Sequence, residues 1–328
     1  MGAMKSYAEY VSLLIDDCES ELSERDLALL CGALLDGGVP DIELGAILAI
    51  FRARSDSAAL LQGMLAALSD RANRWAATER VSPVAIGCYG GTHECPDLTP
   101  LLALLLARFG IPVLMHGPLH AESGVSVALV LRELGVMPCA NKLQAAGELQ
   151  NRGLAFVPDA LLAPGLARLL SLRARLGSIP LLLSAARLID PFQSGSLVVA
   201  AGENEGEIER MRCAIAVTGT RALLLRATEG EAFASPLLRP RMEHWQGGSH
   251  TVLFEEALAQ PRRAPVLPAA SDVKATASWI KQACDGARAV PHPIVNQLAA
   301  CLHATGYCDD FNQAKALAAI AAAGRRVA

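Results

Sequence analysis

VAIGCYGGT, residues 84–92, decides the fold of this chain: a short apolar run ends in a glycine-rich turn. A longer apolar stretch begins near Thr99, and its length and spacing predict a helix. A strand, a glycine-rich turn and a helix in this order are typical of α/β proteins, in which backbone N–H groups at the turn can hold a phosphate. The turn alone is weak evidence for such a site, because glycine-rich turns after strands are common.

Further short apolar runs follow along the chain, separated by helical stretches. The five predicted strands are Val84–Ile86, Pro112–Met115, Leu197–Ala200, Ala222–Leu225 and Thr251–Phe254. Strands that alternate with helices are joined by crossover connections, which favours parallel pairing. We therefore expect an α/β domain with a mostly parallel central sheet.

The sequence before the first strand is helical in pattern. Apolar residues recur at three- and four-residue spacing in Leu27-Leu30-Leu34, and Ser23 with Asp26 forms a capping-box pattern. Residues 1–75 therefore predict a small all-helical bundle. Residues 161–176 predict one helix or two short ones that carry three arginines and no acidic residue. The tail from residue 272 to 328 is again helical in pattern.

Composition limits the class of protein. The chain has 328 residues, 52% hydrophobic and 4% aromatic, which fits about two helix-rich domains. A formal charge of −4 argues against a generally basic surface but leaves room for a local basic groove. Nine cysteines without a CxxC pair indicate reduced thiols and a cytoplasmic protein. We expect no membrane segment, because the apolar run 101–106 is far shorter than the roughly 20 residues that cross a bilayer.

Longer stretches of the sequence carry a specific resemblance. They are GVPDIELG (residues 38–45), LTPL (98–101), HG (116–117), TEGE (228–231), Ala-Ser-Pro (234–236), WI (279–280) and ATG (304–306). Through them the chain resembles the anthranilate phosphoribosyltransferase family, which has the glycosyltransferase family 3 fold. It is most similar to the YbiB-type DNA-binding paralogues of that family.

The resemblance implies a fold and a domain organisation. The fold is α/β with a small all-helical domain, of the nucleoside phosphorylase and class IV phosphoribosyltransferase type. The small helical domain would comprise residues 1–78 together with about 160–178 and would form a homodimer. The α/β domain would comprise residues 79–159 and 179–328, with the family's substrate cleft between the two domains.

The resemblance also identifies a remnant of the family's phosphate site. The enzymes' loop reads GTGGDG and, with a following NIST segment, holds the pyrophosphate and ribose of phosphoribosyl pyrophosphate. Here residues 88–92 stand against TGGDG and residues 97–100 against NIST, so the loop aspartate is missing and Tyr89 replaces a glycine. The remnant comprises Gly87, Tyr89, Gly90, Gly91, Thr92, Thr99, His116 and Gly117.

The charged groups of that site are changed as well. The enzymes' KHGN becomes MHGP at residues 115–118, without the lysine. Their GLDE becomes GEAF at residues 230–233, without the adjacent carboxylates that hold magnesium. Glu229 and Glu231 remain as weak candidates for a metal site, and we otherwise expect no metal. The anthranilate-contacting arginine is kept at Arg173, which marks a remnant of the acceptor pocket.

These changes favour a catalytically degenerate paralogue that binds DNA or RNA without sequence preference, as a homodimer. Phosphate contacts dominate such binding. The candidate contacts are Arg52, Arg54, Arg71, Arg74, Arg168, Arg173 and Arg175. Residues 1–78, however, hold six basic residues against twelve acidic ones, whereas the N-terminus of the YbiB type is basic.

The alternative is an enzyme that transfers a glycosyl or phosphoribosyl group to an unidentified aromatic or nitrogenous acceptor in the interdomain cleft. Arg173 would hold an acid group of the acceptor, and Gly90, Gly91 and Thr99 would hold phosphate. Only this alternative calls for phosphoribosyl pyrophosphate and Mg²⁺. A third interpretation is a protein-interaction scaffold.

Overall fold

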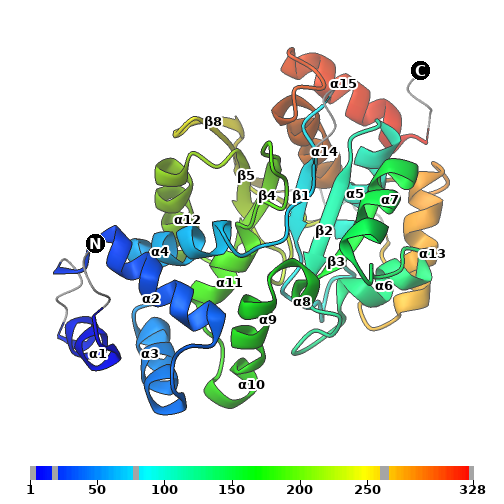
Figure 1. The fold of residues 1–328 in the computed structure, drawn as a ribbon. Coiled ribbons are helices and arrows are strands. Elements are labelled where there is room, and N and C mark those ends of the chain that lie inside the picture. The colour runs from blue at the N-terminus through cyan, green and yellow to red at the C-terminus, as the bar shows by residue number, and fades with distance from the viewer. Residues whose placement is uncertain (1–4, 17–20, 77–80, 259–265, 325–328) are drawn as a thin grey trace.

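The computed structural model describes residues 5–16, 21–76, 81–258 and 266–324. A seven-stranded sheet with the order β3-β2-β1-β4-β5-β7-β8 runs through its centre (Figure 1). The strands are β1 (Val84–Gly87), β2 (Val113–Gly117), β3 (Leu154–Pro158), β4 (Leu197–Gly202), β5 (Ala222–Arg226), β7 (Met242–Gln246) and β8 (Ser249–Phe254). A separate two-stranded pair joins β6 (Leu238–Arg239) to β9 (Ala257–Leu258).

The sheet is mostly parallel, as the sequence predicted. Strands β3, β2, β1, β4 and β5 pair in parallel, and the β7–β8 hairpin continues the sheet in antiparallel pairing. All five predicted strands are confirmed, with ends shifted by one or two residues. Strands β3 and β7 of the sheet, and the short β6 and β9, were not predicted.

In the part of the chain that the structure describes, four helices precede the sheet: α1 (Tyr7–Ile15), α2 (Glu24–Asp36), α3 (Asp41–Ala53) and α4 (Ala58–Ser69). The predicted capping box starts α2, because the Ser23 hydroxyl accepts the N–H of Asp26 and the Asp26 carboxylate accepts the N–H of Ser23. Gly37, at φ 78°, ends this helix in the left-handed conformation that suits glycine. Residues 1–4 and 17–20 of the predicted bundle lie outside the described residues.

The arginine-bearing stretch forms short helices rather than one long helix. After α8 (Asp159–Leu162) come α9 (Pro164–Ser171) and α10 (Arg173–Leu176), beside α2 and α3 (Figure 1). Two side chains tie them to the N-terminal helices. Arg168 donates to the carbonyl oxygen of Leu34, and Arg52 donates to that of Leu176 at 2.7 Å. The segment near residues 160–176 is therefore anchored on the N-terminal bundle.

The remaining helices cover both faces of the sheet. They are α5 (Thr99–Arg108), α6 (Val127–Glu133), α7 (Lys142–Arg152), α11 (Pro180–Arg187), α12 (Glu205–Thr218), α13 (Val273–Cys284), α14 (His292–Ala304) and α15 (Phe311–Ala322). Helices α13 to α15 confirm the helical tail as far as residue 324, and residues 325–328 lie outside the described part.

Alternate side chains of the central strands divide the core into two layers. Ala85, Leu114 and Val198 pack into one apolar cluster with the N-terminal helices, α11 and α12. Val84 and Ile86 pack into another with α5, α13 and α14. No helix in the described ranges is both long enough and apolar enough to cross a membrane.

Candidate functional site

The glycine-rich loop lies at the carboxyl end of β1, beside the end of β2. Gly87 is paired in register with His116, and the N–H of Cys88 donates to the His116 carbonyl oxygen at 2.8 Å. Gly117 passes so close to Cys88 that a Cβ on it would lie 2.0 Å from the Cys88 carbonyl oxygen. The structure therefore brings the two predicted parts of the phosphate-site remnant together, at the edge where open α/β sheets bind ligands.

Two glycines of the loop are packed against the protein's own backbone. A Cβ on Gly90 would lie 2.7 Å from the Glu229 carbonyl oxygen, and one on Gly91 would lie 2.1 Å from that of Ser123. The next residue, Thr92, pairs with Val125 in an isolated antiparallel β-bridge, with reciprocal backbone hydrogen bonds of 3.2 and 2.9 Å. Because these glycines lack a Cβ, neighbouring segments of the chain pack directly against the loop backbone.

The carboxylate of Glu229 binds the main chain just after the loop. One oxygen accepts the N–H groups of His93 and Glu94, and the other accepts that of Cys95 at 2.8 Å. Partial burial acts to raise the pKa of Glu229, but these three N–H groups together lower it below the usual value for a glutamate. Glu229 therefore acts as an internal anion on a set of backbone donors.

The backbone of Glu229 is itself unusual. Its φ of 51° makes it the one non-glycine residue with positive φ among the described residues. The turn is closed by reciprocal backbone hydrogen bonds of 3.0 Å between Thr228 and Glu231. A glutamate in the left-handed region costs on the order of 1 kcal/mol, which the contacts of its carboxylate offset.

Glu231 reaches the loop from the other end of this turn. Its Oε1 accepts the N–H of Gly90 at 2.9 Å, and the residue is only 1% exposed. Burial raises the pKa of Glu231 well above the ordinary value, and the nearby carboxyl of Asp97 raises it further. Burial therefore disfavours the ionised form of Glu231.

Asp97 and Thr99 lie at the start of α5, the helix that follows the loop in the sequence. The Asp97 Oδ1 accepts the N–H of Thr99 at 2.8 Å, and burial raises the pKa of Asp97 to about 6. The hydroxyls of Thr92 and Thr99 are buried without a hydrogen-bond partner among the described residues. The sequence pattern identified Thr99 but not the role of Asp97 as a second buried acid.

Tyr89 fills space between the two strand ends. Its hydroxyl lies 3.1 Å from Nδ1 of His116, and the two rings meet edge to face at 5.7 Å. Burial lowers the pKa of His116 to about 3, so the imidazole is neutral at neutral pH. A neutral, tyrosine-bound histidine contributes no positive charge for a phosphate.

Arg187, which the sequence did not single out, lies behind the Glu229–Glu231 turn. It is 2% exposed and donates to Glu207 at 2.8 Å and to Glu203 at 2.9 Å. Its charge is thus matched by carboxylates within the protein. No local pattern marks this group, because its two partners lie on β4–α12 while Arg187 ends α11.

The residues do not fit the Mg²⁺ site of the enzymes. Both oxygens of Glu229 accept main-chain N–H groups, and Glu231 is only 1% exposed with Oε1 bound to the Gly90 N–H, so neither presents a pair of free anionic oxygens. In the described ranges no three His, Cys, Asp or Glu side chains gather in a way that could hold a metal ion. The weak metal candidates Glu229 and Glu231 are instead parts of the loop's own packing.

A cleft of about 510 Å³ lies beside Tyr89, between the β2 and β3 loops and α9. Arg173, the predicted acceptor-pocket residue, lines it and forms a 3.0 Å ion pair with Glu122. Burial raises the pKa of Asp159, which lies in the same cleft. The predicted acceptor-pocket arginine thus lines a cleft, and its guanidinium is already paired with a carboxylate of the protein.

Most of the seven predicted nucleic-acid arginines have a partner within the protein. Arg52, Arg54 and Arg168 donate to carbonyl oxygens at the C-terminal ends of helices, those of Leu176, Leu14 and Leu34. Arg71 binds Asp36 through two hydrogen bonds of 2.7 Å, and Arg173 binds Glu122.

Arg74 and Arg175 differ from the other five. Neither has a hydrogen bond or ion pair with another described residue, and Arg175 is exposed on α10. Arg175 lies near Arg52, which binds the carbonyl oxygen of the following residue, Leu176. Arg74 lies apart from them, in a hollow after α4.

The mostly parallel sheet, the helical bundle beside it and the glycine-rich loop at the end of β1 define a protein with a phosphoribosyltransferase-type fold. Solved structures agree. The anthranilate phosphoribosyltransferase of Thermus thermophilus gives a TM-score of 0.72 at 19% identity, over 92% of each chain. The Saccharomyces cerevisiae enzyme, in complex with phosphoribosyl pyrophosphate and Mg, gives 0.70 at 14% identity, over 96% of this chain and 93% of that enzyme.

Sequence comparison identifies the family. YbiB of Escherichia coli K12 is 31% identical over 286 residues, 86% of this chain and 89% of YbiB. The anthranilate phosphoribosyltransferase of Desulforudis audaxviator is 28% identical over 148 residues, 45% of this chain and 42% of that enzyme. The chain therefore belongs to the anthranilate phosphoribosyltransferase-like family, in the branch that includes YbiB. No protein-family model matches it.

Proposed function

We propose that this protein is a catalytically degenerate member of its family that does not transfer the phosphoribosyl group of phosphoribosyl pyrophosphate. One observation carries the proposal: carboxylates of the Glu229–Glu231 turn accept four main-chain N–H groups, those of Gly90, His93, Glu94 and Cys95. A diphosphate would need such donors and would meet carboxylate oxygens in their place. The negative charge of the Glu229 carboxylate then opposes binding of the diphosphate.

The electrostatics of the site support the same conclusion. His116 is neutral, Arg187 is paired with Glu203 and Glu207, and the carboxyls that remain do not fit Mg²⁺. A leaving pyrophosphate needs positive charge in the transition state, and each missing interaction of that kind costs about 3 kcal/mol or about a hundredfold in rate.

We propose that the protein instead binds nucleic acid without sequence preference, through the exposed side of α9 and α10. Residues 161–176 contain no acidic residue, and Arg175 is exposed and free of a described partner. Arg52 lies beside it through the hydrogen bond to Leu176. Because residues 1–78 are acidic overall, the contact is assigned to this side and not to the N-terminal helices as a whole.

A homodimer would double this surface. Large apolar side chains are exposed on the N-terminal helices, among them Ile42 at 85%, Ile15 at 64% and Leu29 at 38%. Exposed apolar groups of this size favour a protein interface on the helical bundle. Light scattering of the eluting protein tests this part, with a monomer mass as the contradicting result.

Fluorescence polarisation of labelled single- and double-stranded oligonucleotides at several salt concentrations tests nucleic-acid binding. The proposal predicts that affinity falls as the salt concentration rises. In Arg175→Ala, the slope of log affinity against log salt concentration should be smaller by about the value of one phosphate contact. Arg132→Ala, an exposed arginine on α6 at the other face of the sheet, is the matched control and should bind normally. Absence of binding at low salt, or equal loss in both variants, contradicts the proposal.

The cleft supports a second candidate function, transfer to an unidentified aromatic or nitrogenous acceptor. The observation that favours it is the cleft of about 510 Å³ with Arg173 on its wall. An acidic acceptor would have to displace Glu122 from Arg173. Stabilisation of the folded protein by aromatic carboxylic acids such as anthranilate, lost in Arg173→Met, would support this candidate over simple nucleic-acid binding.

A further inference from the structure

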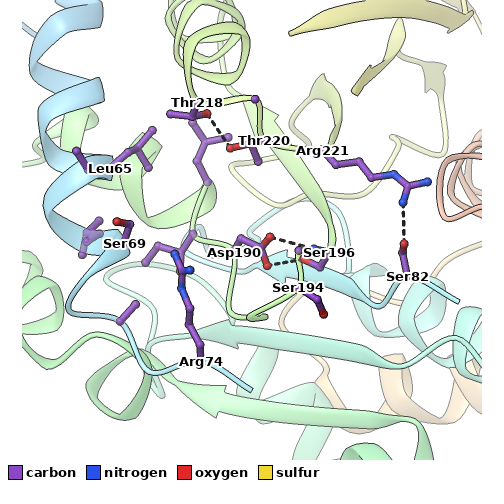
Figure 2. Close-up of a pocket in the computed structure, with 17 residues that line it drawn as sticks. Leu65, Ser69, Arg74, Ser82, Asp190, Ser194, Ser196, Thr218, Thr220 and Arg221 are labelled. Carbon is purple, nitrogen blue, oxygen red and sulfur yellow. Dashed lines mark hydrogen bonds between the residues drawn. The ribbon is translucent and has the colours of Figure 1, made fainter. Parts of the chain in front are cut away.

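A hollow of about 560 Å³ lies beside the end of α4, and its polar side chains are mostly engaged within the protein (Figure 2). Asp190 accepts the hydroxyl of Ser196 at 2.8 Å, and the hydroxyls of Thr218 and Thr220 lie 2.7 Å apart. Arg74 is unpaired there, but the Asp190 carboxylate in the same hollow opposes an anionic ligand. The charges of the cleft beside α9 restrict a ligand more sharply.

This cleft, of about 510 Å³ beside Tyr89, has two arginines in its lining, and both have partners in the protein. Arg173 is paired with Glu122 at 3.0 Å, and Arg168 donates to the carbonyl oxygen of Leu34. Their guanidinium groups are therefore not free to hold an acidic ligand. A cationic ligand is disfavoured as well, because it would meet both guanidinium groups.

Asp159 is the one acid among the described residues that line the cleft. Its Oδ1 accepts the N–H of Ala160 at 2.8 Å, whereas Oδ2 has no hydrogen bond or ion pair with another described residue. Burial raises the pKa of Asp159, and the N–H of Ala160 and the charge of Arg173 partly offset this effect. Burial also raises the pKa of Tyr89, and the carboxyl of Asp159 raises it further. Because this carboxyl acts on two other lining residues, it lies on the cleft side of its loop.

The remaining walls of the cleft are largely apolar. Pro118, Pro158 and Pro164 line it together with Leu119, which is 43% exposed. Apolar side chains that are exposed in a concave place, with a few polar groups among them, are typical of small-molecule sites. The volume is also in the range of such sites. Rigid proline rings favour a flat, rigid ligand over a flexible chain, because less freedom is lost on binding.

Together these features select a neutral, planar molecule with hydrogen-bond donors. The guanidinium groups disfavour a cation, and the carboxyl of Asp159 disfavours an acid beside it. An ionised carboxylate only accepts hydrogen bonds, and its two oxygens can accept a pair of parallel N–H groups. Guanine is a neutral planar base that presents such a pair on one edge, its N1–H and its N2 amino group.

We propose that this cleft binds a nucleoside of the guanine class, with N1–H and the N2 amino group donated to the carboxylate of Asp159 and the ring between the apolar walls. The inference rests on the cleft of the second candidate function, whose nitrogenous ligand it identifies, but not on a transfer reaction. It is separate from the contact of Arg175 with nucleic acid. Failure of oligonucleotide binding therefore leaves this inference intact.

Isothermal titration calorimetry with guanosine and inosine as probes tests the proposal. Inosine lacks the N2 amino group, so guanosine should bind about tenfold or more tighter, because a carboxylate oxygen loses its donor with inosine. Asp159→Asn replaces one acceptor oxygen with a donor and should remove this preference. Asp309→Asn, at an exposed aspartate between α14 and α15, is the matched control and should keep it.

No saturable binding of guanosine, equal affinities for the two probes, or a preference that survives Asp159→Asn would overturn the proposal. The comparison of the two probes on the unaltered protein decides the matter even if Asp159→Asn does not fold. Anthranilate as a third probe separates the inference from the second candidate function. Binding of anthranilate without binding of guanosine would favour an acidic acceptor and refute the guanine assignment. Binding of guanosine without phosphoribosyl transfer would support the guanine assignment and refute the transfer.

Discussion

The main-chain N–H of Gly90 donates a 2.9 Å hydrogen bond to Oε1 of Glu231, a residue 141 positions further along the chain. Glu229, from the same turn, binds the next main-chain donors of the loop region. Carboxyl groups of one turn therefore accept main-chain N–H groups in and just after the glycine-rich loop. These contacts have measurable consequences for stability and pH dependence and, under the proposed function, for ligand binding.

Removing the internal anion should destabilise the protein. Glu229→Ala leaves three N–H groups without their acceptor and should lower the free energy of unfolding by about 2 kcal/mol, measured by urea denaturation. Glu94→Ala, at an exposed neighbouring position, is the control and should change it by less than about 0.5 kcal/mol. Equal effects of the two changes would contradict the role of Glu229.

Asp97→Asn should change how stability depends on pH. The pKa of Asp97 in the folded state, about 6, is higher than its pKa in the unfolded state. Below about pH 4 the carboxyl is protonated in both states and does not oppose folding, whereas between about pH 4 and 6 the unfolded state ionises first and the wild type loses stability. The variant lacks this loss and should be about 2 kcal/mol more stable relative to wild type at pH 7 than at pH 4. Parallel stability curves for the two proteins between pH 4 and 7 would contradict the buried ionisation of Asp97.

The Tyr89 side chain should matter more for its volume than for its hydroxyl. Tyr89→Phe removes the hydrogen bond to His116 and should cost about 1 kcal/mol of stability. Tyr89→Gly, which restores the glycine of the enzymes' loop, should cost about 3–5 kcal/mol because it leaves a cavity. Similar melting temperatures for the two variants would show that the ring is not part of the core.

Two arginines of the same region should respond differently to substitution. Arg168→Ala removes a donor from the end of α2 and should lower stability by about 1 kcal/mol, whereas Arg175→Ala should leave it unchanged. Thermal melting checks both. A loss of stability in Arg175→Ala would show that this side chain has a structural contact and would remove it from the proposed nucleic-acid surface.

The sequence predicted the central fold because its signals are local. Leu197–Gly202 and residues 222–225 are continuous apolar runs of the kind that parallel strands bury on both faces. The sequence did not predict strand β7 because Glu243 and His244 interrupt its apolar pattern. Glu243 is buried in the structure, where it forms ion pairs with Arg212 and Arg241. Local pattern gives no indication of such a paired buried charge.

The candidate site could be predicted only in outline. The sequence indicated an altered loop at residues 87–92, but not that the Glu229–Glu231 turn binds it, because that contact joins segments far apart in the chain. Partners of single arginines, such as Glu122 for Arg173, likewise depend on tertiary packing that spacing does not reveal.

Isothermal titration of the protein with phosphoribosyl pyrophosphate in the presence of Mg²⁺ tests the central claim most directly. Because carboxylates occupy the main-chain donors of the loop, we expect no saturable binding dependent on that loop up to millimolar concentration, in the wild type or in Gly90→Ala. Micromolar binding that requires Mg²⁺ and is lost in Gly90→Ala would contradict the claim, and would show that the loop still holds a diphosphate.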